Sequence, residues 1–270
     1  FPLFIKSLGV DEGTLGFIAA ASTVVGIVTS LPAGTLSDAW GRWRVIMLSM
    51  VIFATAPFLY LLVHTPWQLV VVRMYHGLAT AILGPVALAA VADTFQKERG
   101  ERMAWYSSAT MTGRFLAPTV GGQLIIGQDF RWVYLGCGIS GVLALLTATR
   151  LPRLRSSSPS SASRPRWGQV KQELRFVLAH RAILITSLTE AAQYFSFGAV
   201  ETYLPLYLAA LGWEPRVIGP LFTAQVMSIT LSKPFLGRAS DRWGRRPLIV
   251  LGLLGGAGVV ALLPRVISFL

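Results

Sequence analysis

Eight long apolar runs constrain this chain more than any other feature of its sequence. They lie at about 14–36, 45–63, 67–91, 104–127, 132–151, 182–208, 216–236 and 247–263. A helix needs about 20 mostly apolar residues to cross roughly 30 Å of hydrocarbon, whereas a β-strand needs only about 9–11. Lipid offers no partner to free backbone groups, so runs of this length predict helices. We therefore expect an all-α, multi-pass membrane protein.

Two apolar stubs flank the eight runs. Residues 1–5 stop at Lys6, and residues 266–270 reach the last residue. The first residue is Phe1, and no charged segment or small-residue cleavage site precedes it, so the first stub is interpreted as the tail of a helix and not as a signal peptide. The second stub is interpreted as the start of a further helix. A bundle truncated at both ends is the resulting expectation.

The net charge of +12 would suggest a nucleic-acid or anionic partner if the protein were soluble. When the loops are counted alternately, however, seventeen of the 24 lysines and arginines fall on one side of the membrane and four on the other. The remaining three, Arg73, Arg114 and Lys233, lie within runs. Cytoplasmic loops carry the excess of positive charge, so the richer side is predicted to be cytoplasmic. The charge then predicts orientation, with the lipid bilayer and not nucleic acid as the partner.

A polar segment divides the chain into two parts. Residues 152–166 read PRLRSSSPSSASRPR, a composition typical of a flexible linker, here basic and cytoplasmic. Residues 167–180 place Val170, Leu174 and Val177 on one helical face, which predicts a short helix on the inner membrane surface. The alternative is a continuation of the next span. The expected organisation is an N-terminal repeat at 1–151, a linker at 152–181 and part of a C-terminal repeat at 182–270.

An internal repeat supports this division. Residues 34–42 read GTLSDAWGR, residues 237–245 read GRASDRWGR, and six of the nine positions match. Both copies follow one apolar run and precede another on the predicted cytoplasmic side. Equal orientation indicates parallel repeats related by an axis along the membrane normal. With six spans per repeat, the first repeat lacks most of one helix, and the second needs three more helices after residue 263.

Three motifs carry a resemblance to a known family. The repeated element resembles the loop signature between helices two and three of the major facilitator superfamily. Its matching residues are Gly34, Asp38, Gly41 and Arg42 in the first copy and Gly237, Asp241, Gly244 and Arg245 in the degenerate second copy. Residues 73–77 are similar to the R-x-x-Q-G element of helix four, with His76 in place of glutamine. The residues Gly113, Ala117, Pro118, Gly121 and Gly122 match the antiporter signature of helix five, with Ala117 in place of a glycine.

The resemblance implies a fold and a function. The fold is a major facilitator bundle of two parallel six-helix repeats, of which this chain spans the end of helix one to the start of helix ten. The implied function is alternating-access transport of a small molecule, in the drug and small-molecule:proton antiporter branch. The proton gradient would drive it without a cofactor, in a monomer of the plasma (inner) membrane. A sugar or metabolite uptake symporter and a non-transporting sensor or channel are the alternatives.

The resemblance also implies a latch on the cytoplasmic side. Aspartate in a tight glycine-bounded turn can accept hydrogen bonds from backbone N–H groups at a neighbouring helix start. Asp38 would dock at helix eleven, outside this sequence, and Asp241 at the start of helix five near residues 102–105. Both contacts would favour the state closed to the cytoplasm. The alternative is that each motif merely forms a polar turn.

Ionisable groups within spans are the candidates for proton coupling, because burying an unpaired charge in lipid is costly. They are Arg73, Arg114 and the pair Glu190 and Glu201, whose spacing of eleven residues places both carboxylates on one helical face with Tyr194 and Gln193. The resemblance implies that helices four and seven line the central cavity, so we expect these glutamates to face Arg73. There they would carry a proton or hold a cationic substrate. Structural ion pairing is the alternative.

Small residues on helix five predict a close helix contact. Gly113, Ala117 and Gly121 recur every four residues, which lets a membrane helix approach its neighbour, and Pro118 bends it. The same spacing is common in helix contacts that have no role in transport.

An enzyme is the rival class. The G-x-S-G pattern around Ser140 superficially fits an intramembrane serine protease, but the one downstream histidine, His180, lies at the edge of the linker. The sequence has one cysteine, Cys137, no paired histidines and no glycine-rich nucleotide loop. We therefore expect neither an enzyme nor a metal site.

Overall fold

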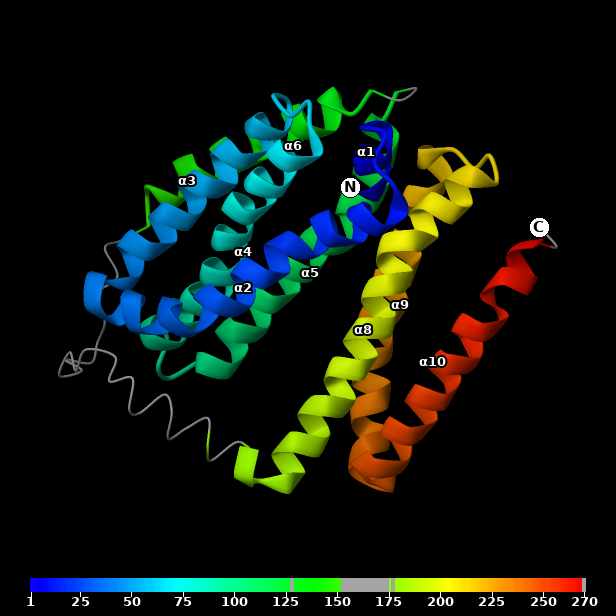
Figure 1. Cartoon of the computed structure of the whole chain (residues 1–270). Coiled ribbons are helices and arrows are strands. Elements are labelled where there is room, and N and C mark those ends of the chain that lie inside the picture. The colour runs from blue at the N-terminus through cyan, green and yellow to red at the C-terminus, as the bar shows by residue number, and fades with distance from the viewer. Residues whose placement is uncertain (127–128, 152–174, 176–177, 269–270) are drawn as a thin grey trace.

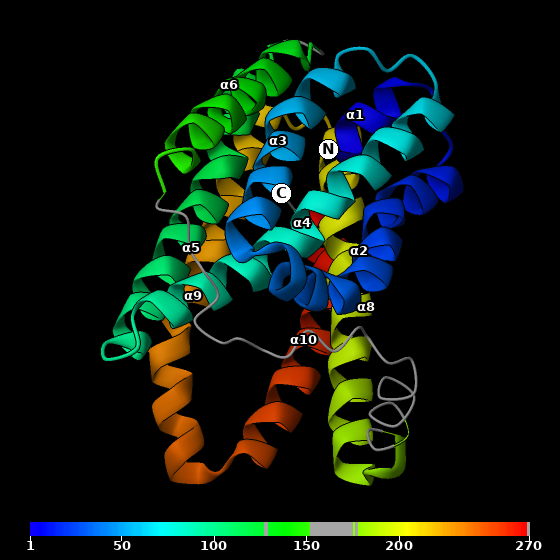
Figure 2. The ribbon, with the colours of Figure 1, turned by 90° about the vertical axis from the view of Figure 1, so that its left-hand side faces the viewer.

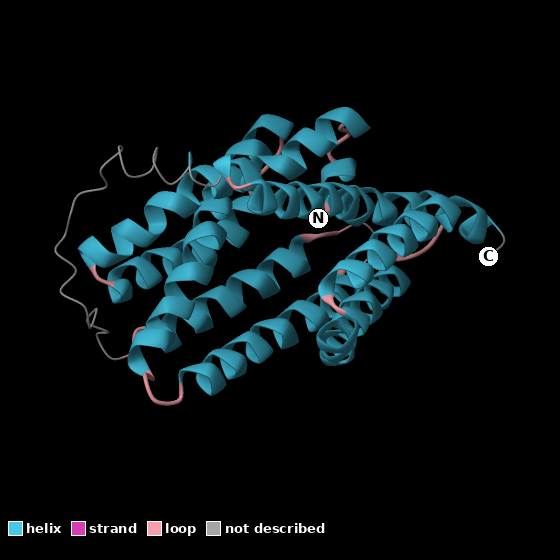
Figure 3. Cartoon of the chain, turned by 90° about the horizontal axis from the view of Figure 1, so that it is seen from below, coloured by secondary structure: helices cyan, strands magenta, loops and turns pink. Residues whose placement is uncertain are grey.

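The computed structural model describes residues 1–126, 129–151, 175 and 178–268; within its helices, the side chains at 30–32, 34–35, 38–39, 234, 237, 241 and 263–268 lie outside the description. The described residues form nine helices (Figure 1). These are α1 (Pro2–Ser7), α2 (Glu12–Trp40), α3 (Arg42–Tyr60), α4 (Pro66–Thr94), α5 (Arg99–Leu124), α6 (Arg131–Ala148), α8 (Arg181–Ala210), α9 (Pro215–Trp243) and α10 (Arg245–Ser268). Figure 3 shows helix throughout the described chain; the one strand-type pairing there is a bridge between Ile126 and Asp129.

The eight long helices coincide with the eight predicted runs. Five of them, α2, α3, α4, α6 and α10, are long and apolar enough to cross a membrane by length and composition alone. Helices α5, α8 and α9 are as long, with 26, 30 and 29 residues, but more polar. Helices that line a polar pathway or another helix need not be apolar on every side. The all-α membrane fold predicted from the sequence is confirmed.

Helices α2 to α6 form one group and α8 to α10 a second (Figures 1 and 2). In the first group α2 packs along α4, and α3 packs against both α4 and α6. Two buried clusters hold this group together. One surrounds Leu15, Ile18 and Leu69 near the starts of α2 and α4, the end predicted to face outward, and the other surrounds Val45 and Val86 near the opposite end, which is predicted to be cytoplasmic. In the second group α10 packs on α9.

The two groups meet near their outer ends. Helix α5 packs on α9 through residues 115–123 of α5 and 215–223 of α9, and α1 lies against α8. Figures 1 and 2 show the lower parts of α8, α9 and α10 extending away from α2–α6. The described contacts between the groups therefore hold one end of the helices together, the end predicted to face outward, while the ends predicted to be cytoplasmic stand apart.

The two repeated motifs form single-glycine turns, not loops. Gly41 alone separates α2 from α3 with φ 89°, and Gly244 alone separates α9 from α10 with φ 84°. Only glycine adopts such a backbone without strain, so the glycine ends each helix. The expectation that Asp38 and Asp241 lie in a loop is therefore wrong, since each belongs to the last turn of its helix. The matching geometry of the two copies agrees with parallel repeats.

Two further expectations concern the linker and the C-terminal stub. The linker and most of the predicted surface helix fall within 152–174 and 176–177, outside the described residues, so they and the division at 151 and 182 stay predictions. The C-terminal stub is not a separate helix start, because α10 continues through Pro264 to Ser268. One proline removes one backbone hydrogen bond, which bends a membrane helix without ending it.

Candidate functional site

Arg73, the eighth of the 29 residues of α4, contacts a backbone carbonyl and an aromatic ring. Its Nη2 donates to the backbone oxygen of Ala19 on α2 at 2.6 Å, and its guanidinium carbon lies 4.2 Å from the ring centroid of Phe1. Its Nε is buried without a described hydrogen-bond partner. A cation over an aromatic face is attracted by the ring quadrupole, so the Phe1 ring helps to position the Arg73 guanidinium.

His76 lies one turn further along α4, in an aromatic setting. Its Nδ1 is 3.4 Å from the hydroxyl of Tyr60, and its ring meets the ring of Phe53 edge-on at 5.4 Å. Tyr60 in turn stacks on Tyr134 of α6, with ring centroids 4.9 Å apart. The structure therefore places Arg73 and His76, both predicted site residues, along one part of α4.

Among the described residues, Tyr203 links α8 to α2 by a hydrogen bond. Its hydroxyl donates to the backbone oxygen of Glu12 at 3.1 Å and lies against Gly16, where an added Cβ would come within 2.7 Å of the Tyr203 oxygen. A bulkier residue at position 16 would displace the ring. The absence of a side chain at Gly16 therefore leaves the space that the Tyr203 hydroxyl occupies.

Because Tyr203 contacts α2, the glutamates of α8 lie on the side of that helix that points away from α2. Glu201 precedes Tyr203 by two residues, which places it about 160° around the helix, and Glu190 lies in line with Glu201. Both carboxylates are exposed, and in the described residues neither forms an ion pair with Arg73. The expectation that the glutamates face Arg73 is wrong for this arrangement, although they do share one helical face with Tyr194, which is 66% exposed. Gln193 is exposed beside them.

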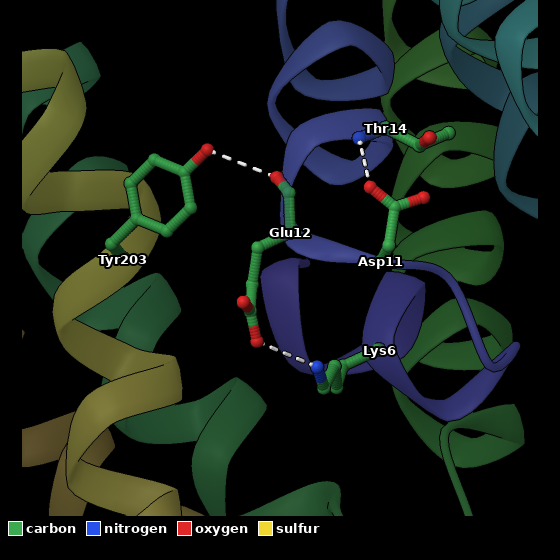
Figure 4. A network of polar contacts seen from close by, with 5 residues as sticks. All are labelled: Lys6, Asp11, Glu12, Thr14 and Tyr203. Atoms are coloured by element: carbon green, nitrogen blue, oxygen red, sulfur yellow. Dashed lines mark hydrogen bonds and ion pairs between the residues drawn. The ribbon is translucent and has the colours of Figure 1, made fainter.

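Figure 4 shows a polar network of Lys6, Glu12 and Tyr203, with the cap formed by Asp11 and Thr14 beside it. We call Lys6, Glu12 and Tyr203 the outer clasp, together with Gly16, which lies against the Tyr203 hydroxyl. Lys6 pairs with the carboxylate of Glu12 at 2.9 Å. Asp11 caps α2 by accepting from the backbone N–H of Thr14 at 2.9 Å. Hydrogen bonds from the Thr14 side chain and then its backbone hold the pKa of the Asp11 carboxyl below its ordinary value. The sequence analysis missed this clasp, because its key acceptor is a backbone oxygen.

A second contact, which we call the seam, joins α5 to α9 with almost no side chain between them. A Cβ added at Gly122 would lie 2.5 Å from the backbone oxygen of Pro215, and one added at Gly219 would collide with the backbone oxygen of Pro118. By contrast, nothing lies within 4 Å of a Cβ added at Gly113 or Gly121. The close approach expected of the Gly113–Ala117–Gly121 stripe is therefore made by the adjacent face, through Gly122.

Polar contacts complete the seam. The hydroxyls of Thr119 and Thr223 are 2.7 Å apart, and Thr223 donates to the backbone oxygen of Phe115 at 2.6 Å. Gln123 donates to the backbone oxygen of Arg216 at 3.3 Å. Phe115 lies in the turn bent by Pro118, so a hydroxyl from the other repeat supports the proline-containing turn. Arg114, one residue earlier, is exposed.

At the end of the bundle predicted to be cytoplasmic, Arg42 pairs with a residue that the sequence did not reveal. Its Nη2 lies 2.8 Å from the carboxylate of Asp93, at the last turn of α4, and the two side chains are 13% and 30% exposed. Asp93 is the one acidic residue between positions 39 and 97, so it was the one carboxylate in that range that the sequence offered as a partner for Arg42. The ion pair ties the repeated motif to helix α4.

The predicted docking of Asp241 stays a prediction, because its side chain lies outside the described residues. At the expected docking position, Arg102 pairs with Glu98 at 2.7 Å and Trp105 donates to Glu101 at 3.4 Å. The Glu98 carboxylate, by hydrogen bond and by charge, raises the pKa of the Arg102 guanidinium. In this arrangement both expected partners therefore interact within the first turns of α5.

The G-x-S-G pattern serves helix packing. A Cβ added at Gly138 would lie 2.5 Å from the ring of Phe58, and one added at Gly141 would lie 2.7 Å from the backbone oxygen of Phe53. Both glycines therefore let α6 approach α3, while Ser140 between them is exposed. The spacing is explained without catalysis.

The fold and these contacts define a polytopic α-helical membrane protein built from two parallel repeats. Comparison with known proteins gives the family. The model of the Major Facilitator Superfamily matches residues 1–269, and the chain belongs to that family.

Curated relatives include Multidrug resistance protein 2 of Bacillus subtilis, 26% identical over 275 residues, with 99% of this chain and 68% of the relative covered. Quinolone resistance protein NorA of Staphylococcus aureus is 23% identical over 224 residues, with 82% of this chain and 56% of the relative covered. Among solved structures, the inward-open xylose transporter XylE of E. coli has a TM-score of 0.58 at 18% identity, covering 82% of this chain and 58% of that one. That likeness shows the fold, and the chain spans between about half and two thirds of the length of these proteins.

Proposed function

We propose that the protein is a proton-coupled exporter of small molecules that works by alternating access in the plasma membrane, with residues 152–181 in the cytoplasm. One observation supports the proposal: the described contacts between the repeats lie at one end of the helices, the end predicted to face outward, while the opposite ends stand apart. A carrier that exposes its cavity to one side at a time needs this arrangement and a second one, in which the cytoplasmic ends meet and the outer ends separate. The relatives whose names refer to multidrug and quinolone resistance support export.

Flux in proteoliposomes tests the proposal. The expected result is uptake of a fluorescent quinolone into inverted vesicles that saturates with concentration and stops when the pH gradient is collapsed. Flux that does not saturate would indicate a channel and contradict the proposal. Net movement in the opposite direction would instead support a sugar or metabolite symporter.

Proton coupling is proposed to use Glu190, an exposed carboxylate ten residues into α8. A carboxylate at membrane depth can bind a proton on one side and release it on the other. Glu190→Gln is expected to abolish gradient-driven flux while substrate exchange without a gradient persists. Glu201→Gln is the matched control, because Glu201 is on the same face but nearer the outer end. Unchanged gradient-driven flux in Glu190→Gln would exclude Glu190 from the coupling step.

A further inference from the structure

Positive charge is concentrated around the single-glycine turn between α9 and α10. Positions 217–264 of the sequence hold one acidic residue, Asp241, and five cations: Lys233, Arg238, Arg242, Arg245 and Arg246. All five cations are exposed, and in the part of the chain that the structure describes none of them forms an ion pair. The turn therefore presents positive charge that the described residues do not neutralise.

The first copy of the repeated motif is balanced differently. Arg42, the counterpart of Arg245, has a side chain that is 13% exposed and pairs with Asp93 at 2.8 Å. Both turns are made by one glycine with a positive φ, so neither needs the additional arginines of the second copy to form. The charge around the second turn is therefore available for another role.

The turn lies at the depth of the lipid headgroups. Helix α9 has 29 residues and a length of about 43 Å, more than the roughly 30 Å of hydrocarbon but close to the full thickness with the headgroup regions. Trp243, its last residue, is 65% exposed, and tryptophan is enriched at this depth. Figures 1 and 2 show this end of α9 extending away from α2–α6, so the first group does not cover the turn.

Two of the arginines continue an apolar stripe along α9. Leu231, Phe235, Arg238 and Arg242 follow one another at intervals of four, three and four residues, which places them on one face of the helix. Leu231 and Phe235 are 60% and 69% exposed. Phe235 lies twelve positions after Thr223, about 120° around the helix from the seam with α5. This exposed face is therefore apolar toward the membrane interior and cationic at its end.

A lipid phosphate fits this arrangement. Side chains four residues apart on a helix have Cβ atoms about 5–6 Å apart, and arginine pairs with phosphate oxygens through two parallel hydrogen bonds. Arg238 and Arg242 can therefore share one phosphate while an acyl chain lies along Phe235. Arg245 and Arg246 favour a headgroup with net negative charge, because a zwitterionic headgroup would add an ammonium group to a site that is already positive.

We propose that the end of α9 and the α9–α10 turn form a binding site for an anionic glycerophospholipid, with its phosphate between Arg238 and Arg242 and an acyl chain along Phe235 and Leu231. A lipid bound there fixes the depth of this end of the second group in the membrane. The proposal is independent of the transport function, because it requires neither a substrate nor a proton gradient.

Competition for a labelled lipid tests the site. Radiolabelled dioleoylphosphatidylglycerol is bound to the protein immobilised in mild detergent and displaced with unlabelled competitors. We expect displacement by phosphatidylglycerol at lower concentrations than by phosphatidylcholine with the same chains. Equal displacement by the two lipids would overturn the proposal and leave the arginines as a signal of orientation. Displacement by polyglutamate at lower concentrations than by phosphatidylglycerol would overturn it in favour of an acidic protein partner.

Paired substitutions locate the binding. Arg238→Gln with Arg242→Gln is expected to weaken phosphatidylglycerol binding about thirtyfold, since each arginine near a membrane surface contributes about 1 kcal/mol. The matched control is Arg99→Gln with Arg150→Gln, which removes the same charge from two exposed arginines at the same predicted side of the membrane. That control should bind like the parent. Equal weakening in both double variants, or none in the first, would overturn the assignment.

Two further measurements separate a lipid from free phosphate. Phe235→Ser removes the apolar contact for the acyl chain and leaves every arginine in place, so it should weaken binding of phosphatidylglycerol. Inorganic phosphate in large excess should leave the labelled lipid bound. Unchanged binding in Phe235→Ser together with displacement by inorganic phosphate would identify a phosphate site and overturn the lipid assignment.

Discussion

A methyl group added at Gly122 should force the seam apart. The new Cβ would lie 2.5 Å from the backbone oxygen of Pro215, whereas carbon and oxygen normally approach no closer than about 3.3 Å. The helices must therefore separate by roughly 0.8 Å, since the opposing atom is backbone and cannot rotate away. That separation stretches the Thr119–Thr223 hydrogen bond from 2.7 Å to about 3.5 Å, the limit at which it is lost.

The energetic cost follows from these two effects. Overpacking costs about 1–3 kcal/mol, and the lost hydrogen bond adds about 1 kcal/mol. A change of about 2–4 kcal/mol shifts the balance between joined and separated outer ends roughly thirtyfold or more. Gly122→Ala is therefore expected to populate an arrangement in which the outer ends are separated.

Gly121→Ala is the matched control, because nothing lies within 4 Å of its added Cβ. That variant should leave the seam intact and gain helix propensity of up to about 1 kcal/mol. Spin labels at Ile126 and Leu211, which are 56% and 48% exposed, report the distance between the outer ends in a Cys137→Ser background. The reasoning is refuted if both alanine variants give the same distance distribution, or if Gly122→Ala matches the parent.

Three further predictions concern the ends of the helices. Asp93→Asn should lower the stability by about 2 kcal/mol, because it removes the charge that pairs with the mostly buried Arg42 guanidinium across 2.8 Å. A thermal melt in detergent that matches the parent would contradict this. Tyr203→Phe should lose one hydrogen bond to the Glu12 backbone and so raise the ratio of separated to joined outer ends about fivefold. The same pair of spin labels measures this ratio. The pKa of Asp11 is lowered in the folded state, so its cap stabilises α2 fully at pH values above the ordinary carboxyl pKa of about 3.9. Protection of the first turn of α2 from hydrogen exchange should therefore fall only as the pH drops below that value. A loss of protection between pH 5 and 7 would argue against the cap.

Part of the site was predictable and part was not. The repeated motif correctly marked two tight turns between helices, because Gly41 and Gly244 each take a backbone conformation that favours glycine. The partner of Arg42 could not be named, since Asp93 lies 51 positions away and nothing local relates the two. The clasp was equally hidden, because the acceptor for Tyr203 is a main-chain oxygen that every residue possesses.

The sequence by itself determined the membrane-spanning helices and the two parallel repeats, and it predicts their orientation from the side on which charge collects. The helices and the repeats follow from the length of the apolar runs and the recurrence of a motif, which are properties of the linear sequence. Only the tertiary structure decided which face of each helix meets which neighbour. One position along a helix is a rotation of about 100°, so Gly121 and Gly122, or Glu201 and Tyr203, are neighbours in sequence but face different surroundings. Packing between distant segments sets that rotation, and with it the seam and the clasp.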